Sequence, residues 1–221
     1  MRKYQAVIFD LDGTLLNTLE DLMDSVNFAL RQFQLPERSL EQIRCSVGNG
    51  VRRLMELSVP GGLQNPGFEE IFQTFQTHYT EHCNDKTRLY PGITLLLQRL
   101  KAQGIKMAIV SNKYHEAVQE LKEMYFKDYL SVAIGEKEGI RKKPAPDTVM
   151  EALRELRLTK EQAVYVGDSD VDLKTAANSG MDCLSVTWGF RTKEELLAAG
   201  AAVMIDNPEE ILKYVNQIKI K

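Results

Sequence analysis

Short apolar runs rich in β-branched residues recur along this chain, and segments long enough for amphipathic helices separate most of them. The runs are QAVIF, KMAIV, VAIG, AVYV, CLSV and AVMI. Buried strands that alternate with helices are typical of a parallel sheet with crossover helices. We therefore expect an α/β fold built on a doubly wound parallel sheet. Helix signals agree: Thr159 and Gln162 fit a capping box, and Gly104 and Gly180 stand where helices should end.

The stretch from residue 16 to residue 83 has helical patterns and no convincing strand. Two apolar stripes at helical spacing lie in it. They are Leu22, Val26, Leu30 and Phe33, and then Phe68, Ile71, Phe72, Phe75 and Tyr79. The turn signal Pro91-Gly92 follows where the chain re-enters the sheet. We expect a helical cap at 16–83, inserted into an α/β core made of 1–15 and 84–221.

Charge and cysteine content narrow the partners. The 28 basic and 31 acidic residues give a formal net charge of -3 without a basic stripe, which argues against a nucleic-acid or anionic-membrane partner and favours a small substrate. The three cysteines are scattered and lack CxxC spacing, which is typical of a reducing compartment. No segment approaches the roughly 20 apolar residues of a membrane span. We expect a cytoplasmic protein, either a monomer or a homodimer.

Three apolar runs end abruptly in polar residues: VIF in Asp10, AIV in Ser111-Asn112, and VYVG in Asp168. The carboxyl ends of parallel strands share one crevice, so these positions are expected to face a common ligand. In FDLDGT, an ionised Asp10 could attack phosphorus and hold a metal, while Asp12 holds the proton that a leaving oxygen needs. The alternative is a simple Asp- and Gly-rich turn.

Four motifs together, FDLDGT, the Ser-Asn after the second strand, KKPAP and GDSDVD, resemble the haloacid dehalogenase superfamily over nearly the whole chain. The order of cap, YPG, IVSNK, Lys-Pro-x-Pro and GDS, together with VGNGVRRLME, is similar to its phosphoglycolate phosphatase-like branch. Dehalogenases of the superfamily lack the second aspartate of the first motif. Asp12 therefore favours phosphoryl transfer.

The resemblance implies a role for each matching residue. Asp10 would be the nucleophile, and Asp12 would act first as the general acid and then as the base. Ser111 would donate a hydrogen bond to the phosphoryl group, with the Asn112 backbone beside it. Lys143 would neutralise the charge of the phosphate. Positioning and positive charge are what a loose phosphoryl-transfer transition state needs most. Lys142 competes with Lys143, but we expect it to be a solvated surface group.

The acids of GDSDVD complete the expected site. Asp168 would be a metal ligand, and Asp172, one helical turn later, a supporting carboxylate directed to the same pocket, whereas Asp170 points elsewhere. In the family, the metal takes the side chains matching Asp10 and Asp168 and the backbone carbonyl matching Asp12. Such oxygen ligands suit Mg²⁺. Helix capping is the alternative explanation for Asp170 and Asp172.

The resemblance implies a magnesium-dependent phosphatase that hydrolyses a small phosphorylated metabolite through an aspartyl-phosphate on Asp10, with 2-phosphoglycolate as the best match. Inorganic pyrophosphatase and sugar-phosphate phosphatase or mutase activities stay open, because they would share every core residue. A catalytically idle binding module is a different-class alternative, and the intact acids argue against it.

The cap is expected to decide the substrate. Gly48-Asn49-Gly50 opens a helix whose free backbone N–H groups could bind a second anionic group, such as a carboxylate, and Arg52 lies close behind. Equally, these glycines could serve only a tight helix start. Asn17 replaces an acidic residue common in this branch, which weakens any hinge role there.

One rival motif lies in the cap, where His78, Glu81 and His82 match the H-x-x-E-H pattern of inverted zinc proteases. A pattern with only three fixed positions is a weak signal, and the sequence offers no evident third zinc ligand. We expect His78 and His82 to be solvated or packed, and His115 to have no catalytic role.

Overall fold

The computed structural model describes residues 4–216 of the chain. Its contacts divide into two compact units, which we call the core unit, up to Leu15 and from Leu89 onward, and the helical unit, Leu16–Arg88. The two segments where the chain passes between units, β2 (Leu16–Asn17) and β3 (Arg88–Leu89), form a two-stranded sheet.

The helical unit extends five residues beyond the cap interval expected from the sequence, 16–83. The reason is the buried carboxylate of Asp21, which accepts hydrogen bonds from the backbone N–H groups of Lys86 and Thr87 and from the Thr87 hydroxyl. A buried carboxylate needs such partners, so residues 84–88 stay with the helices. The strand β2 was not expected in this stretch. The role of the unit as a cap stays a prediction.

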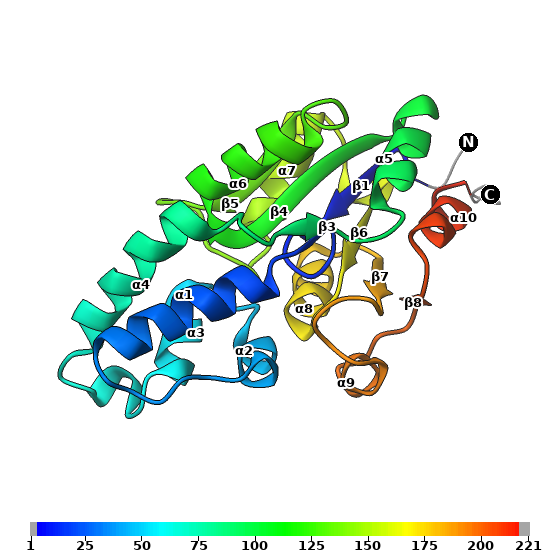
Figure 1. The fold of residues 1–221 in the computed structure, drawn as a ribbon. Helices are drawn as coiled ribbons and strands as arrows, with labels where there is room; N and C mark the ends of the chain where they lie inside the picture. Colours follow the sequence, from blue (N-terminus) through cyan, green and yellow to red (C-terminus); the bar gives the residue numbers. More distant parts are fainter. Residues whose placement is uncertain (1–3, 217–221) are drawn as a thin grey trace. The chain divides into compact units, whose positions relative to one another are not determined.

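The core unit contains a six-stranded parallel sheet in the order β5-β4-β1-β6-β7-β8 (Figure 1). The strands are β1 (Ala6–Phe9), β4 (Lys106–Tyr114), β5 (Val132–Glu136), β6 (Ala163–Gly167), β7 (Cys183–Val186) and β8 (Met204–Ile205). Each coincides with one of the six apolar runs. The prediction of a doubly wound α/β sheet is thus confirmed.

Helices connect these strands. They are α5 (Ile93–Ala102), α6 (His115–Leu121) with the π-turn η2 (Lys122–Phe126), α7 (Asp147–Leu156), η3 (Lys160–Gln162), α8 (Asp170–Ser179), α9 (Lys193–Ala198), η4 (Pro208–Glu210) and α10 (Ile211–Val215). On one sheet face, Ala6 and Ile8 pack with Val149 of α7 and Ala176 of α8. The alternate residues of β1 are also fully buried, so both sheet faces are covered.

Local sequence signals mark both the starts and the ends of helices in the core unit. The capping box of Thr159 and Gln162 is present, and a second one, between Ser169 and Asp172, starts α8. Gly180 ends α8 with a φ of 66°, a left-handed conformation that a side chain would disfavour. Because α8 starts directly after β6, its first turn lies at the carboxyl edge of the sheet.

The helical unit consists of α1 (Leu19–Gln32), α2 (Leu40–Ser46), α3 (Val51–Ser58), η1 (Gly62–Gln64) and α4 (Phe68–His82). Both predicted stripes are buried apart from Phe33, which lies just past the end of α1 and is half-buried. Along α4 the successive aromatic rings stack at centroid distances of 5.3–6.4 Å. None of the helices in the described part of the chain has both the length and the apolar character needed to cross a bilayer.

Candidate active site

The sheet order brings distant parts of the chain to one edge. Strand β1 lies between β4 and β6, and its last residue, Phe9, is level with Ile109 and Val166. The residue after β1 is Asp10, whose backbone N–H donates to the Val166 carbonyl at 2.9 Å. The three polar positions named from the sequence therefore lie on neighbouring strands at the same edge: Asp10 and Asp168 directly follow β1 and β6, and Ser111-Asn112 lie in the last part of β4.

The Lys143 ammonium joins two of the acids. Its Nζ lies 2.6 Å from Asp10 Oδ1, 2.8 Å from Asp172 Oδ1 and 3.2 Å from the Tyr165 hydroxyl. The Tyr165 hydroxyl in turn donates to Asp172 Oδ1 at 2.9 Å. The Lys143 side chain is only 3% exposed, so water contributes little to this network. Buried charges of this kind are tolerated because each is paired and hydrogen-bonded.

Further short hydrogen bonds hold Asp168 and the second oxygen of Asp172. Asp168 accepts from the Thr14 hydroxyl at 3.0 Å and from the Phe190 backbone N–H at 2.7 Å. The second oxygen of Asp172 accepts from the hydroxyl and the backbone N–H of Ser169, at 2.6 and 3.1 Å. Asp172 is thus both a helix-capping residue and a member of the buried cluster, so helix capping does not exclude a place in the pocket.

Two glycines make room for these carboxylates. A Cβ atom on Gly13 would lie 2.3 Å from an oxygen of Asp168, and one on Gly167 would lie 2.3 Å from the carboxyl carbon of Asp172. Gly13 also has a φ of 89°. Only glycine satisfies both the close approach and this backbone conformation at position 13.

The electrostatics of the cluster follow from burial and from its uneven charge. Burial, with the charge of Asp172 adding to it, raises the pKa of Asp168 to about 7. Burial and the nearby carboxylates also raise the pKa of Asp10 well above its ordinary value, although Lys143 opposes them. For Lys143, burial alone would lower the pKa, but Asp10 and Asp172 outweigh it and hold the pKa above its usual range. Three neighbouring carboxylates with one ammonium therefore favour the retention of a proton at neutral pH.

This donor set fits a hard divalent cation. Oxygen atoms of Asp10, Asp168 and Asp172 lie within 4.8 Å of one another, and all three residues are buried. Within residues 4–216 they form the only group of three or more such side chains so arranged. A divalent cation would replace the proton that the excess negative charge otherwise retains.

The second acid of FDLDGT lies in a separate, positively charged corner. Asp12 accepts a bond from the Ser111 hydroxyl at 3.4 Å, and its other oxygen is 3.3 Å from Lys113 Nζ. Lys113 is as deeply buried as Lys143, with a side chain 3% exposed. The two acids of the motif thus have different cationic partners, which suits different tasks.

The side chain of Asn112 makes a contact that the sequence did not predict. We expected its backbone to contact a phosphate, and that role stays a prediction. Its carboxamide binds the backbone of Lys143, accepting from the N–H at 2.8 Å and donating to the C=O at 3.0 Å. The side chain therefore acts within the protein.

Three buried residues of the site were missed from the sequence: Lys113, Tyr165 and Thr14. For Tyr165, a signal existed, because a phenol in a fully buried strand needs a hydrogen-bond partner. Lys113 comes directly after Ser111-Asn112 in β4, yet no local sequence pattern indicates that its partner is Asp12, 101 residues away. Thr14 reads as part of a turn.

The remaining core residues lie where the sequence indicates. Lys142 pairs outward with Glu136 at 3.5 Å, with a side chain 40% exposed. Asp170 pairs with Lys174 at 2.8 Å and is no member of the buried cluster. His115, the first residue of α6, accepts a bond from the Gly135 backbone N–H of β5 at 3.2 Å.

In the helical unit, the glycine turn starts α3. Gly50 is the N-cap residue with a φ of 85°, and Gly48 has a φ of 126°, values that suit the tight helix start. Arg52 makes two hydrogen bonds to Glu69 and lies 5.3 and 5.1 Å above the rings of Phe68 and Phe72. Its guanidinium is thus engaged inside the unit, and any substrate contact would compete with this pair.

The histidine pair has packed surroundings. His78 stacks on Phe28, with ring centroids 4.1 Å apart, and its Nδ1 lies 3.0 Å from the Ser25 hydroxyl. The Nδ1 atom of His82 lies 2.8 Å from Asp85. Neither belongs to a group of three potential metal ligands in the part of the chain that the structure describes. The zinc-hydrolase alternative gains no support.

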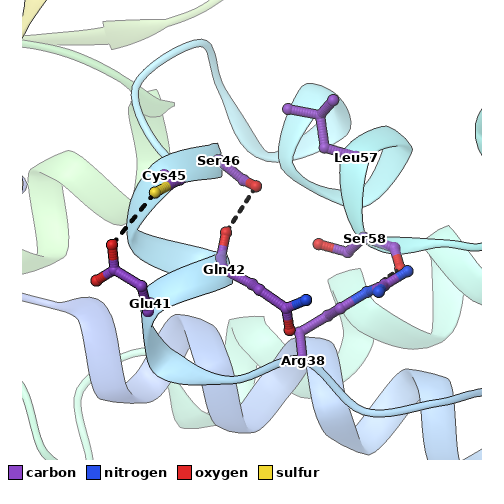
Figure 2. A pocket seen from close by; sticks show the side chains of 7 residues that line it. All are labelled: Arg38, Glu41, Gln42, Cys45, Ser46, Leu57 and Ser58. Carbon is purple, nitrogen blue, oxygen red and sulfur yellow. Dashed lines mark hydrogen bonds between the residues drawn. The ribbon is translucent and has the colours of Figure 1, made fainter.

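The helical unit also has a hollow of its own, of about 330 Å³, between α2 and α3 (Figure 2). Its polar lining is largely bonded to itself: Arg38 donates to the Ser58 carbonyl at 2.7 Å, and Cys45 contacts Glu41 at 3.5 Å. None of the predicted substrate-binding residues lines this hollow.

Several known proteins are similar to this chain over most of its length. Residues 7–186 match the family described as haloacid dehalogenase-like hydrolase. The chain is 31% identical to phosphoglycolate phosphatase 1 of Pseudomonas aeruginosa, covering 96% of this chain and 79% of that protein. It is 36% identical to a phosphoglycolate phosphatase of Rhodobacter capsulatus, covering 84% of this chain and 85% of that protein.

A crystal structure from Lactobacillus delbrueckii subsp. bulgaricus, of a protein provisionally named phosphoglycolate phosphatase, superposes with a TM-score of 0.92 at 35% identity. The match covers 98% of this chain and all of that one. The length of the family match and the identity to these relatives lead to one conclusion: this chain belongs to the haloacid dehalogenase-like hydrolases.

Proposed function

We propose that this hydrolase is a Mg²⁺-dependent phosphatase that cleaves 2-phosphoglycolate through an aspartyl-phosphate on Asp10. The observation that carries the proposal is the buried cluster of Asp10, Asp168, Asp172 and Lys143 at the carboxyl edge of the sheet, with Asp12 beside it in a second charged corner. The names of the relatives support the phosphatase class and the substrate.

In the first step, an Asp10 carboxylate oxygen attacks phosphorus and the P–O bond to the leaving group breaks. Asp12 gives its proton to the departing oxygen, so that an alcohol leaves rather than an alkoxide. Ser111, which now donates to Asp12, is close enough to that acid to donate to a phosphoryl oxygen as well. The Lys143 ammonium beside Asp10 reduces the repulsion between the attacking carboxylate and an anionic phosphate.

In the second step, the Asp12 carboxylate takes a proton from water, and the resulting nucleophile attacks the phosphorus of the aspartyl-phosphate. The bond between phosphorus and the Asp10 oxygen breaks, which releases phosphate and restores the carboxylate. Lys113 and Ser111 keep Asp12 in place for both proton transfers. Asp10 and Asp12 therefore need different surroundings.

The magnesium ion would be held by Asp10 and Asp168, with the backbone carbonyl of Asp12 as a further ligand and Asp172 in support. When bound, Mg²⁺ supplies positive charge that stabilises the phosphoryl group during transfer. Burial and the neighbouring carboxylates raise the pKa values of Asp10 and Asp168, and a divalent cation held by them would oppose this rise.

For the substrate, we propose that the carboxylate of 2-phosphoglycolate binds the backbone N–H groups of the Gly48-Asn49-Gly50 turn. The start of α3 presents such groups, and the helix dipole favours an anion there. Arg52 is the second candidate, in competition with Glu69.

The test is a kinetic comparison of 2-phosphoglycolate, pyrophosphate, a hexose phosphate and p-nitrophenyl phosphate, each with Mg²⁺ and with excess EDTA. We expect the highest kcat/KM for 2-phosphoglycolate and no turnover in EDTA. A higher kcat/KM for pyrophosphate or the hexose phosphate would reassign the substrate and leave the chemistry unchanged. Turnover that persists in EDTA would contradict the metal requirement.

A further inference from the structure

The side chain of Asn112 makes a contact that the proposed reaction does not itself use. Its carboxamide forms two hydrogen bonds with the backbone of one residue, Lys143, which lies 31 positions further along the chain. Asn112 is 6% exposed and Lys143 is 3% exposed, so water does not compete for these bonds. A buried backbone N–H and C=O must find partners, and here one side chain supplies both.

The segment that carries Lys143 has little local structure to fix it. In the described chain, no helix or strand falls between the end of β5 at Glu136 and the start of α7 at Asp147. Three consecutive basic residues lie in this segment, and two of them face outward. Arg141 pairs with Asp147 at 2.9 Å, and Lys142 pairs with Glu136.

Only the third basic residue, Lys143, points into the acid cluster. The Asn112 carboxamide binds both the N–H and the C=O of residue 143, as the peptide unit of a neighbouring strand would. With the backbone fixed, the ammonium reaches Asp10 and Asp172 at 2.6 and 2.8 Å.

We infer that Asn112 is a positioning residue that selects Lys143 over Lys142 and holds its ammonium on Asp10. The same strand end supplies Ser111 and Lys113 to Asp12. The end of β4 therefore sets both charged corners of the site at once. A change in the backbone of this strand end would therefore displace Lys143, the partner of the nucleophile, and also both partners of the proton donor Asp12.

The first experiment measures the position of Lys143 without using activity, so it stands even if the proposed function fails. An amine-acetylating reagent is added to the wild-type protein and to Asn112→Ala, and the labelled fractions of Lys142 and Lys143 are followed by mass spectrometry. We expect Lys143 labelling to become at least about tenfold faster in the variant, with Lys142 as an unchanged internal control. Equal Lys143 rates in the two proteins would overturn the inference.

The second experiment is a double-mutant cycle in kcat/KM, and it rests on the proposed function. For Asn112→Ala we expect a loss of about ten- to hundredfold that is equal for 2-phosphoglycolate and p-nitrophenyl phosphate, because Lys143 acts on the phosphoryl group common to both. In a Lys143→Met background, Asn112→Ala should change kcat/KM by less than about threefold. The same loss in both backgrounds would mean that Asn112 acts on the substrate directly.

Two further variants keep the test decisive. Asn178 donates one bond to the Pro144 carbonyl in the same loop, at 2.9 Å, so Asn178→Ala is the control for loosening the loop without releasing Lys143. If Asn112→Ala fails to fold, Asn112→Asp retains the acceptor for the Lys143 N–H, removes the donor to the Lys143 C=O and adds a negative charge. We expect it to show the same two effects with smaller size; unchanged labelling in this variant would count against the inference.

Discussion

Both units of the molecule pair cations with carboxylates, but they do so in opposite settings. In the core unit, Lys143 is 3% exposed and has two acids and a phenol as partners. In the helical unit, Arg52 is 49% exposed and has one acid, Glu69, together with two aromatic rings. In water-filled surroundings such attraction is screened, whereas in a buried site it is strong and an unpaired charge is costly.

This difference in burial predicts how strongly substitutions in each unit should affect activity. The core cluster holds its geometry before any ligand arrives, so substitutions there should abolish chemistry. The surface pair can exchange partners with solvent, so substitutions there should alter little. The following variants test this contrast in order of decreasing expected effect.

The largest effect is expected for Asp10→Asn. The amide keeps the size of the side chain but removes the attacking carboxylate, so kcat should fall by about five powers of ten or more. The protein should stay folded, since Lys143 retains Asp172 as a partner. Residual turnover above about one per cent, with an unchanged circular dichroism spectrum, would place the nucleophile elsewhere.

Asp12→Ala should be less severe and should change the balance of the two steps. Each proton transfer could slow by about two to four powers of ten. With p-nitrophenyl phosphate, whose leaving group needs little protonation, the first step should suffer less, so phosphoenzyme should accumulate. Mass spectrometry of the quenched variant should find the phosphate on the peptide with Asp10, and an adduct on Ser111 or a histidine would contradict the assignment.

Lys113→Met tests the second charged corner, with Lys142→Met as the matched control. Loss of the buried ammonium beside Asp12 should lower kcat/KM by about ten- to a hundredfold, because the acid loses a positioning contact. Removing the exposed Lys142 should leave kcat/KM within about twofold. Similar losses in both variants would mean that overall positive charge matters, and the contrast between buried and exposed lysines would fail.

The pH dependence of metal binding should report the buried carboxylates. Since burial raises the pKa of Asp168 to about 7, the folded protein retains a proton there, from about pH 4 to pH 7, that the unfolded chain has lost. Without metal, this carboxylate therefore lowers stability as the pH rises through that window. Above pH 7 the cation no longer displaces the Asp168 proton, so Mg²⁺ should bind about tenfold tighter at pH 8 than at pH 6.

Calorimetric titration at the two pH values measures this difference. Asp168→Asn provides the control, because it removes the titrating group and should flatten the pH dependence while weakening binding. Equal affinities at pH 6 and pH 8 in the wild-type protein would contradict the expectation that a carboxyl group with a raised pKa binds the metal.

The smallest effect is expected for Arg52→Ala, compared with Glu69→Ala. Arg52 and Glu69 are partners in an exposed ion pair, and such pairs contribute little to stability. Both variants should therefore leave the Tm almost unchanged. Both should also change the ratio of kcat/KM values for 2-phosphoglycolate and p-nitrophenyl phosphate by less than about threefold. A tenfold loss of 2-phosphoglycolate preference in Arg52→Ala alone would show that the arginine binds substrate.

The strands and the acids of the site could be predicted because their signals are local. Asp10 and Asp168 each interrupt an apolar run, and the parallel topology implied by the sequence brings strand ends together. The partners of Lys113 and Arg52 could not be predicted in this way. They lie 101 and 17 residues away and are chosen by tertiary packing, as is the Asn112 contact with the Lys143 backbone.

The sheet order also has a consequence for the synthesis of the chain. Strand β1 is made first, yet Ala6 pairs with Lys106 on one side and with Ala163 on the other. In the nascent chain, β1 can therefore pair with β4 only after 100 further residues and with β6 only after 157, since non-local pairing cannot begin before the partner is made. Asp168 and Asp172 follow that last partner directly, so the mutually repelling acids meet only when the neighbours that compensate for them have also been translated.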